Sequence, residues 1–194
     1  MAQNSLNIIE KIILIGGSAG SLEVVLHMLP VIEPSNQFAI IIVFHRKNSS
    51  DSSLISLLAS KTKWKVEEAE EKQVIQAGII YLAPADYHLL IEKNETFSLD
   101  YSEKVNYSRP SIDVTFESAA DVFSSRLTGI LLSGANRDGA LGLEKIQQNG
   151  GYTIIQNPDT AEVSQMPLAA KSLIQPDRIA EAAELADIIN QLNE

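Results

Sequence analysis

The fold is decided by residues 11–20, KIILIGGSAG. Residues 12–15 are an unbroken apolar run rich in β-branched side chains, which is typical of a strand buried on both faces. The run ends at two glycines and a serine, and an amphipathic stretch begins at Ser21. The pattern therefore predicts a strand, a tight turn and a helix.

The turn after this strand has three interpretations. Gly16-x-Ser18-x-Gly20 matches the G-x-S-x-G nucleophile elbow, in which small neighbours expose a serine hydroxyl above the sheet edge. Ser18 also fits a helix N-cap or a plain loop residue. A phosphate-binding G-x-G-x-x-G fits less well, because its later glycines fall on Ser18 and Ser21. The turn alone leaves all three open.

Length and charge limit the class of protein. The 194 residues fit a single domain, and we expect residues 1–194 to form one. The net charge of −10 argues against nucleic acid and anionic lipid as main partners, since both would repel the chain. Cysteine is absent, which excludes disulfides and thiolate metal sites and fits a reducing compartment. The apolar runs are far shorter than a membrane span, so we predict a cytoplasmic protein without membrane insertion.

The rest of the chain alternates between strands and helices. The N-terminal half predicts a first helix that ends near Pro30, a strand at 38–44 and a helix over 54–58 that starts from polar residues 48–53. The C-terminal half predicts helices at 112–123, 140–148, 166–173 and 180–192, with strands at 126–132 and 152–156. Short strands at 65–69, 78–84, 87–91 and 96–99, with a hairpin turn at 93–95, indicate a small antiparallel insertion. We therefore predict a doubly wound α/β domain with a mostly parallel sheet.

Three polar residues follow predicted parallel strands. Ser18 follows the first strand, His45 the second, and Asp138 a later one. Ligand sites of such sheets lie beyond the carboxyl ends of the strands, so a nucleophile, a base and an orienting acid would meet at one edge. Two alternatives remain open: His88 is a rival for the base, and Asp138 also fits a helix N-cap. His27 lies inside the first predicted helix and is interpreted as structural.

Four ordered blocks carry a resemblance to a known family. Residues 16–20, 43–45, 109–116 and 131–140 resemble, in order and spacing, the catalytic domain of the chemotaxis receptor methylesterase, CheB. The resemblance implies a protein-glutamate methylesterase, with glutamine deamidation as a second activity and no metal or organic cofactor. It implies Ser18 as nucleophile, His45 as general base and Asp138 as the orienting carboxylate. The oxyanion donors would be backbone amides of Ala135 and Ala19, where the family usually has methionine and threonine.

The resemblance also implies partners. The expected substrates are methylated cytoplasmic helices of chemoreceptors, and a separate response regulator or methyltransferase protein is a further expected partner. Ten residues precede the first predicted strand, so we expect no receiver domain. Two other classes stay open. One is a nucleotide- or NADP-binding protein in which Arg46 and Lys47 meet a 2′-phosphate, and the other is a non-catalytic signalling module that docks on its partners.

Overall fold

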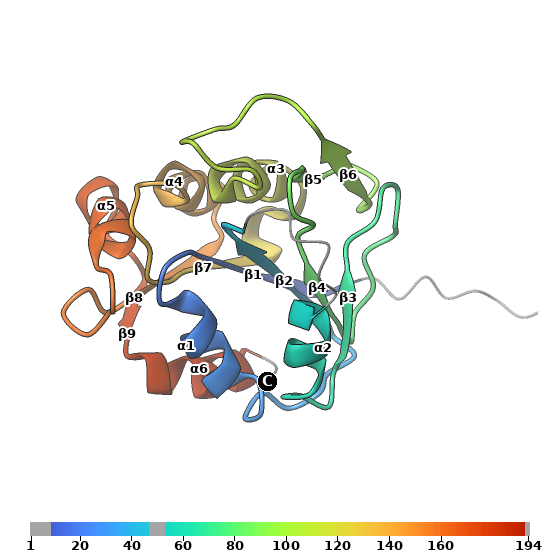
Figure 1. Cartoon of the computed structure of the whole chain (residues 1–194), viewed down its shortest axis with the longest axis horizontal. Coiled ribbons are helices and arrows are strands. Elements are labelled where there is room, and N and C mark those ends of the chain that lie inside the picture. Colours follow the sequence, from blue (N-terminus) through green and yellow to red (C-terminus); the bar gives the residue numbers. More distant parts are fainter. Residues whose placement is uncertain (1–8, 47–52, 193–194) are drawn as a thin grey trace, which may run out of the picture.

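A parallel sheet with helices on both faces forms the body of the protein (Figure 1). The computed structural model describes residues 9–46 and 53–192. In this part of the chain the sheet has seven strands in the order β3-β4-β2-β1-β7-β8-β9, and every neighbouring pair is parallel. The strands are β1 (Lys11–Gly17), β2 (Phe38–Phe44), β3 (Lys65–Glu68), β4 (Ile79–Leu82), β7 (Leu127–Leu131), β8 (Tyr152–Gln156) and β9 (Arg178–Ala180).

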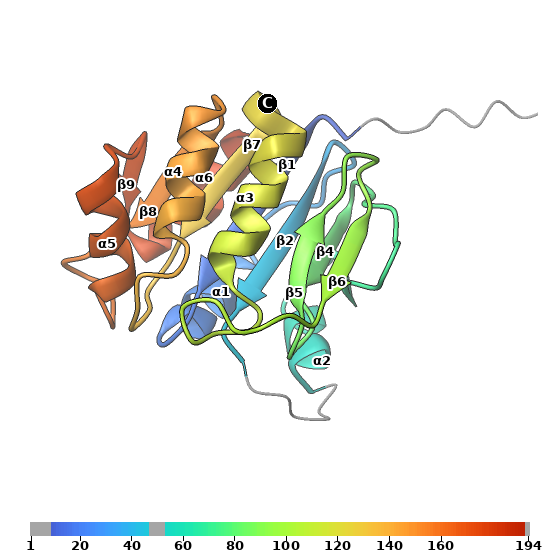
Figure 2. The ribbon, with the colours of Figure 1, turned by 90° about the horizontal axis from the view of Figure 1, so that it is seen from above.

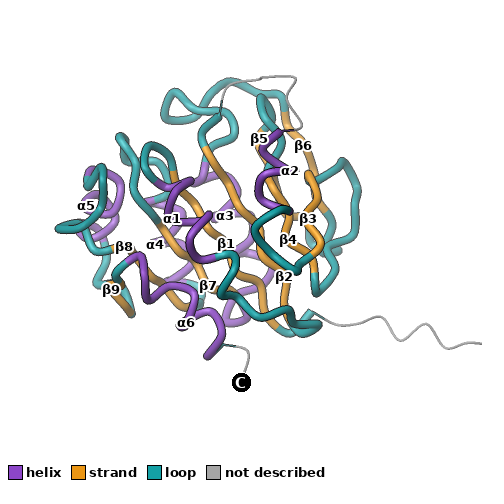
Figure 3. The backbone as a smooth tube through the Cα atoms, turned by 60° about the horizontal axis from the view of Figure 1, so that its bottom comes forward, coloured by secondary structure: helices purple, strands orange, loops and turns teal. Residues whose placement is uncertain are grey.

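The helices are divided between the two faces of the sheet. Helices α3, α4 and α5 cover one face, and α1, α2 and α6 cover the other (Figures 1 and 3). The hairpin of β5 and β6 lies on the face of α3, as the view from above shows (Figure 2). Their bounds are α1 (Ser21–Met28), α2 (Ser53–Ala59), β5 (His88–Ile91), β6 (Phe97–Asp100), α3 (Ile112–Phe123), α4 (Ala140–Gln148), α5 (Gln165–Leu173) and α6 (Leu185–Gln191), with 3₁₀ turns η1 (Ser124–Arg126) and η2 (Ala182–Glu184).

The alternation of side chains along β1 explains why both faces need helices. Ile12 and Leu14 pack into the core under α3 and α4, whereas Ile13 and Ile15 pack into a second core under α1 and α6. Successive strand residues point to opposite faces, so a fully apolar strand must be covered on both sides. The run at residues 12–15 is therefore the physical reason for three layers.

Two glycines connect loops at the carboxyl edge of the sheet to the helices that follow them. Gly20 precedes α1 with φ +79° and Gly139 precedes α4 with φ +93°, in the left-handed region that favours glycine. A Cβ at Gly139 would lie 2.5 Å from Leu131 Cδ1, so there is also no room for a side chain.

The predicted fold class is confirmed, with two corrections. Residues 65–69 and 78–84 contain β3 and β4 of the main parallel sheet, and among the strands of the described residues the antiparallel pair is β5 and β6. The expected helix at 180–192 is also too long, because residues 178–180 form the edge strand β9 and the α-helix begins at Leu185. The predicted helix start at 48–53 falls almost wholly on residues outside the described ranges.

Candidate active site

The carboxyl edge of the sheet brings three loops together. Gly17 and Phe44 are partners in the β1–β2 register, so Ser18 and His45 follow paired residues. The His45 N–H donates to the Gly17 carbonyl at 3.3 Å, and the Ser18 N–H donates to the Ser133 carbonyl beyond β7 at 2.9 Å. These bonds fix the loops after β1, β2 and β7 against one another.

His45 and Asp138 form a hydrogen-bonded pair. The His45 Nε2 lies 2.7 Å from Asp138 Oδ2, and the two side chains are 11% and 0% exposed. An ionised carboxylate only accepts hydrogen bonds, so Nε2 carries the proton and Nδ1 is the nitrogen left as an acceptor. The structure thus joins two predicted site residues that lie 93 positions apart.

The Asp138 carboxylate is bound by the start of α3. It accepts the Ser111 hydroxyl at 2.7 Å and the backbone N–H groups of Ile112 at 2.7 Å and Asp113 at 3.2 Å. Burial by itself would raise the pKa of Asp138, but the hydrogen bonds to the carboxylate, first among them that from His45, hold the pKa below its usual value. Asp138 is therefore ionised at neutral pH, and it caps α3 rather than α4, the helix that follows it.

Asp113, in the first turn of α3, is a second buried carboxylate. Its Oδ1 accepts the N–H groups of Gly139 and Gly142 at 2.8 Å each, so Asp113 caps α4 while Asp138 caps α3. The Asn106 side-chain amide donates to both carboxylates, at 3.0 Å and 3.1 Å. Burial raises the pKa of Asp113 to about 7, and the charge of Asp138 adds to the rise.

The free nitrogen of His45 faces Ser108 in this structure. The Ser108 Oγ lies 3.2 Å from His45 Nδ1. The Ser18 hydroxyl makes no hydrogen bond to any residue in the described ranges, so the structure does not place it on the imidazole. Ser18 nevertheless lies in the turn that is bonded to the His45 backbone through Gly17.

The loops that follow β1 and β7 each leave a backbone donor free. The Ser21 hydroxyl donates to the Ser18 carbonyl at 2.5 Å, and the Ser133 hydroxyl donates to the Ala19 carbonyl at 2.7 Å. Within the described part of the chain, the N–H groups of Ala19 and Ala135 have no acceptor. Free amides of this kind are what an oxyanion hole uses.

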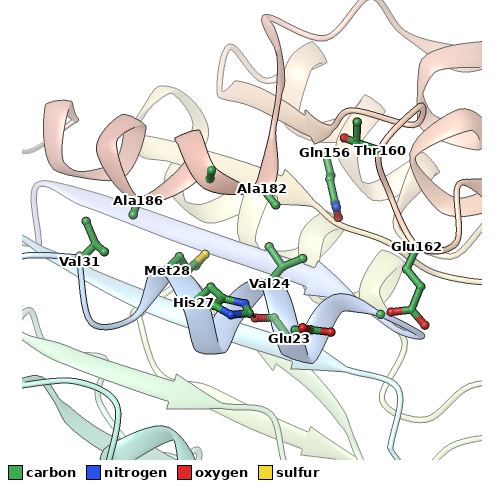
Figure 4. Close-up of a pocket in the computed structure, with 12 residues that line it drawn as sticks. Glu23, Val24, His27, Met28, Val31, Gln156, Thr160, Glu162, Ala182 and Ala186 are labelled. Atoms are coloured by element: carbon green, nitrogen blue, oxygen red, sulfur yellow. Dashed lines mark hydrogen bonds between the residues drawn. The ribbon is translucent and has the colours of Figure 1, made fainter.

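The other two histidines have different surroundings. His88 is buried, its Nδ1 accepts the Ser111 N–H at 3.1 Å, and its Nε2 lies 3.0 Å from the Glu103 carbonyl. Both ring nitrogens are occupied, which removes His88 as a rival base. His27 lies on the exposed side of α1, with Nδ1 2.9 Å from the Glu23 carbonyl. It lines a cavity of about 510 Å³ between α1 and η2–α6, whose wall does not include Ser18, His45 or Asp138 (Figure 4).

Sequence reasoning missed three site residues, Asn106, Ser108 and Asp113. Asp113 stands in the block 109–116 that carried the resemblance, so its place in the first helical turn was the available signal. Asn106 and Ser108 lie in an irregular loop that has no periodic pattern.

The arginine predicted to meet a 2′-phosphate already has partners in the structure. The Arg46 guanidinium is bonded to Glu68 and, at 3.2 Å, to the Ala83 carbonyl, so it is not free for a 2′-phosphate. Lys47 lies outside the described residues. Among residues 9–46 and 53–192 there is no group of three or more metal-ligating side chains, and no helix there is long and apolar enough to cross a membrane.

The fold and the site define the class as a doubly wound α/β domain with a histidine–carboxylate pair at the carboxyl edge of its sheet. Comparison with known proteins then gives the family: the CheB methylesterase family matches residues 13–189, and the chain belongs to it. This confirms the resemblance that the four sequence blocks suggested.

Individual relatives agree with this assignment. A putative protein-glutamate methylesterase/protein-glutamine glutaminase of Leptospira interrogans is 42% identical over 182 residues, 94% of each chain. The corresponding enzyme of Thermotoga maritima is 34% identical over 171 residues, which are 85% of this chain and 48% of that one. The crystal structure of the T. maritima CheB methylesterase catalytic domain superposes with a TM-score of 0.87 and 29% identity, covering 94% of this chain and 98% of the other.

Proposed function

We propose that the protein is a protein-glutamate methylesterase, a carboxylic ester hydrolase that cleaves the γ-methyl ester of glutamate side chains in another protein. Membership of the family supports the reaction. The observation that carries the choice of residues is the 2.7 Å contact between His45 and the buried Asp138, beside the turn that holds Ser18.

In the proposed reaction Ser18 Oγ attacks the ester carbonyl carbon while its proton passes to His45 Nδ1. The imidazolium then gives that proton to the methoxy oxygen, methanol leaves, and an acyl-enzyme remains. A water molecule, deprotonated by the same nitrogen, attacks the acyl carbon, and the proton returns to Ser18 as glutamate is released. The Ala19 and Ala135 N–H groups stabilise the oxyanion.

Ser108 enters this mechanism as a competitor for the base. Its hydroxyl occupies Nδ1 in the structure, so Ser18 must displace it before each turnover. The same contact favours a second candidate, in which Ser108 itself is the nucleophile. Ser18 is preferred because it lies in a strand-to-helix turn and is followed by the free Ala19 N–H, whereas Ser108 lies in a loop.

The substrates and partners follow from the family. We propose methylated cytoplasmic helices of chemoreceptors as substrates, and a separate response-regulator or methyltransferase protein as a partner. Glutamine deamidation would use the same acyl-enzyme, with ammonia in place of methanol as the leaving group.

The test is methanol release from a methyl-esterified glutamyl peptide. We expect Ser18→Ala and His45→Ala to lose at least about 10³-fold in turnover, since the nucleophile and the base act as a unit. Ser108→Ala should keep wild-type turnover or exceed it, because Nδ1 becomes free. Ser172→Ala, an exposed serine of α5, is the matched control.

Two outcomes would contradict the proposal. Wild-type turnover in folded Ser18→Ala with loss in Ser108→Ala would transfer the nucleophile to Ser108. Failure of a fluorophosphonate to label the wild-type protein, together with no methanol release, would instead favour the non-catalytic docking module.

A further inference from the structure

A tight turn beside the site holds a tyrosine in an unfavourable conformation. Val105 and Ser108 exchange backbone hydrogen bonds of 3.2 Å and 2.9 Å, and the residues between them, Asn106 and Tyr107, have φ values of 49° and 63°. Positive φ at both central residues is the pattern of a type I′ turn, which favours Asn followed by Gly. Asn106 fits that preference, whereas Tyr107 stands where glycine is favoured.

The fold gives no reason for this tyrosine. Asn106 bonds the two buried carboxylates and Ser108 bonds His45, so both neighbours have evident partners. The Tyr107 side chain is 97% exposed and packs on nothing. A large aromatic side chain that is both exposed and held in a left-handed conformation beside a site points to contact with a ligand.

The cavity under Tyr107 is unusually cationic for this protein. It measures about 450 Å³, reaches His45, and is lined by three cations and one carboxylate, Asp86. The whole chain has 15 Lys and Arg against 25 Asp and Glu. The charge at this site is therefore opposite in sign to that of the protein as a whole.

Part of that positive charge lacks a partner. Lys104 is exposed and forms no ion pair with a residue of the described ranges. The Arg46 side chain is only 15% exposed, and its guanidinium is paired with Glu68. The third cation, Arg109, is paired with Asp86 at 2.8 Å and stacks on Tyr101 at 3.9 Å. An anionic group from outside would pair with Lys104.

We propose that Tyr107 and Lys104 form a docking surface for an acidic segment of the protein substrate, adjacent to the esterified glutamate. The inference rests on the proposed function, and it adds a substrate class: glutamyl esters flanked by carboxylates. Tyr107 packs on the backbone and aliphatic parts of that segment, while Lys104 attracts its carboxylates. Local attraction of this kind offsets the repulsion expected between an acidic substrate and a chain of charge −10.

The experiment compares three substrates. Two are helical peptides with a central glutamate γ-methyl ester, one flanked by glutamates and one by glutamines, and the third is p-nitrophenyl acetate. The variants are Lys104→Glu and Tyr107→Gly, and the matched control is Lys93→Glu, which makes the same charge change at the β5–β6 turn.

We expect Lys104→Glu to raise KM for the acidic peptide about tenfold at low salt, and this effect should shrink at about 0.5 M salt. The glutamine-flanked peptide and p-nitrophenyl acetate should change less than about twofold. Tyr107→Gly should raise KM for both peptides while the melting temperature stays equal or increases, because glycine suits the turn. A merely structural role would lower stability and activity together.

Binding separates this inference from the proposed function. Fluorescence anisotropy with the glutamate-flanked peptide and Ser18→Ala protein needs no turnover. Weaker binding in the Lys104→Glu background supports the docking surface even when no ester is cleaved. Equal affinity for both peptides, or equal effects of Lys104→Glu and Lys93→Glu, would overturn it.

Discussion

The carboxyl group of Asp113 should make the protein less stable as the pH rises towards neutrality. Its pKa is raised from 3.8 to about 7 on folding, so between these values the folded state binds more protons than the unfolded state. Stability contributed by the protonated group is complete below about pH 4 and is lost as the pH rises through 7. One pKa unit corresponds to about 1.4 kcal/mol, and pH 5 lies about two units below the folded pKa, so the loss between pH 5 and pH 8 is about 3 kcal/mol.

Asp113→Asn removes this titration while keeping an oxygen that accepts the Gly139 and Gly142 N–H groups. We expect the variant to gain about 3 kcal/mol over the wild type between pH 5 and pH 8, measured by urea unfolding at each pH. Asp121→Asn is the control, because hydrogen bonding to Lys145 lowers the pKa of Asp121, so this group titrates only below about pH 4 and its replacement should differ from wild type by a constant amount between pH 5 and pH 8. A constant difference between Asp113→Asn and wild type would refute the reasoning.

Three further variants test the residues that position and stabilise the candidate active site. Asp138→Asn should lower turnover in the methanol assay by about 10⁴-fold with the fold intact, because an amide favours the wrong imidazole tautomer. Ser111→Ala leaves a buried carboxylate one hydrogen bond short and should cost about 1–3 kcal/mol in urea unfolding. Gly139→Ala combines a φ of +93° with a 2.5 Å clash, so calorimetry should show a marked drop in melting temperature together with reduced activity.

The layers of the fold could be predicted because they follow from local patterns. The apolar runs in β1, β2, β7 and β8 are continuous, and the sequence predicts each strand to within about two residues. The edge strand β9 was missed because three residues, only one of them buried, carry no periodic signal. The sequence places β3 and β4 in a small antiparallel insertion, because their own residues do not indicate which strand each will pair with.

The His45–Asp138 contact was predictable for a different reason. Parallel strands end at one edge, so residues just after them converge whatever their separation in sequence. Ser108 and Asn106 come from a connection between β6 and α3 whose path depends on its own tight turn. Their contacts with His45 and the carboxylates depend on how the loop folds, so the local sequence does not predict them.

Helices α3 and α4 are each capped by a carboxylate from the other's start: Asp113 of α3 caps α4, and Asp138, just before α4, caps α3. This arrangement explains how Asp138 stays ionised although it is buried. A lone buried carboxylate tends to take up a proton, because its charge has lost water. Here the positive end of α3 and the Ser111 hydroxyl replace that water for Asp138. Asp113, which receives fewer hydrogen bonds and feels the charge of Asp138, is the member of the pair that takes the proton near pH 7. The negative charge is thereby kept on the carboxylate that contacts His45, so the strength of the base depends on how tightly the two helix ends are held together.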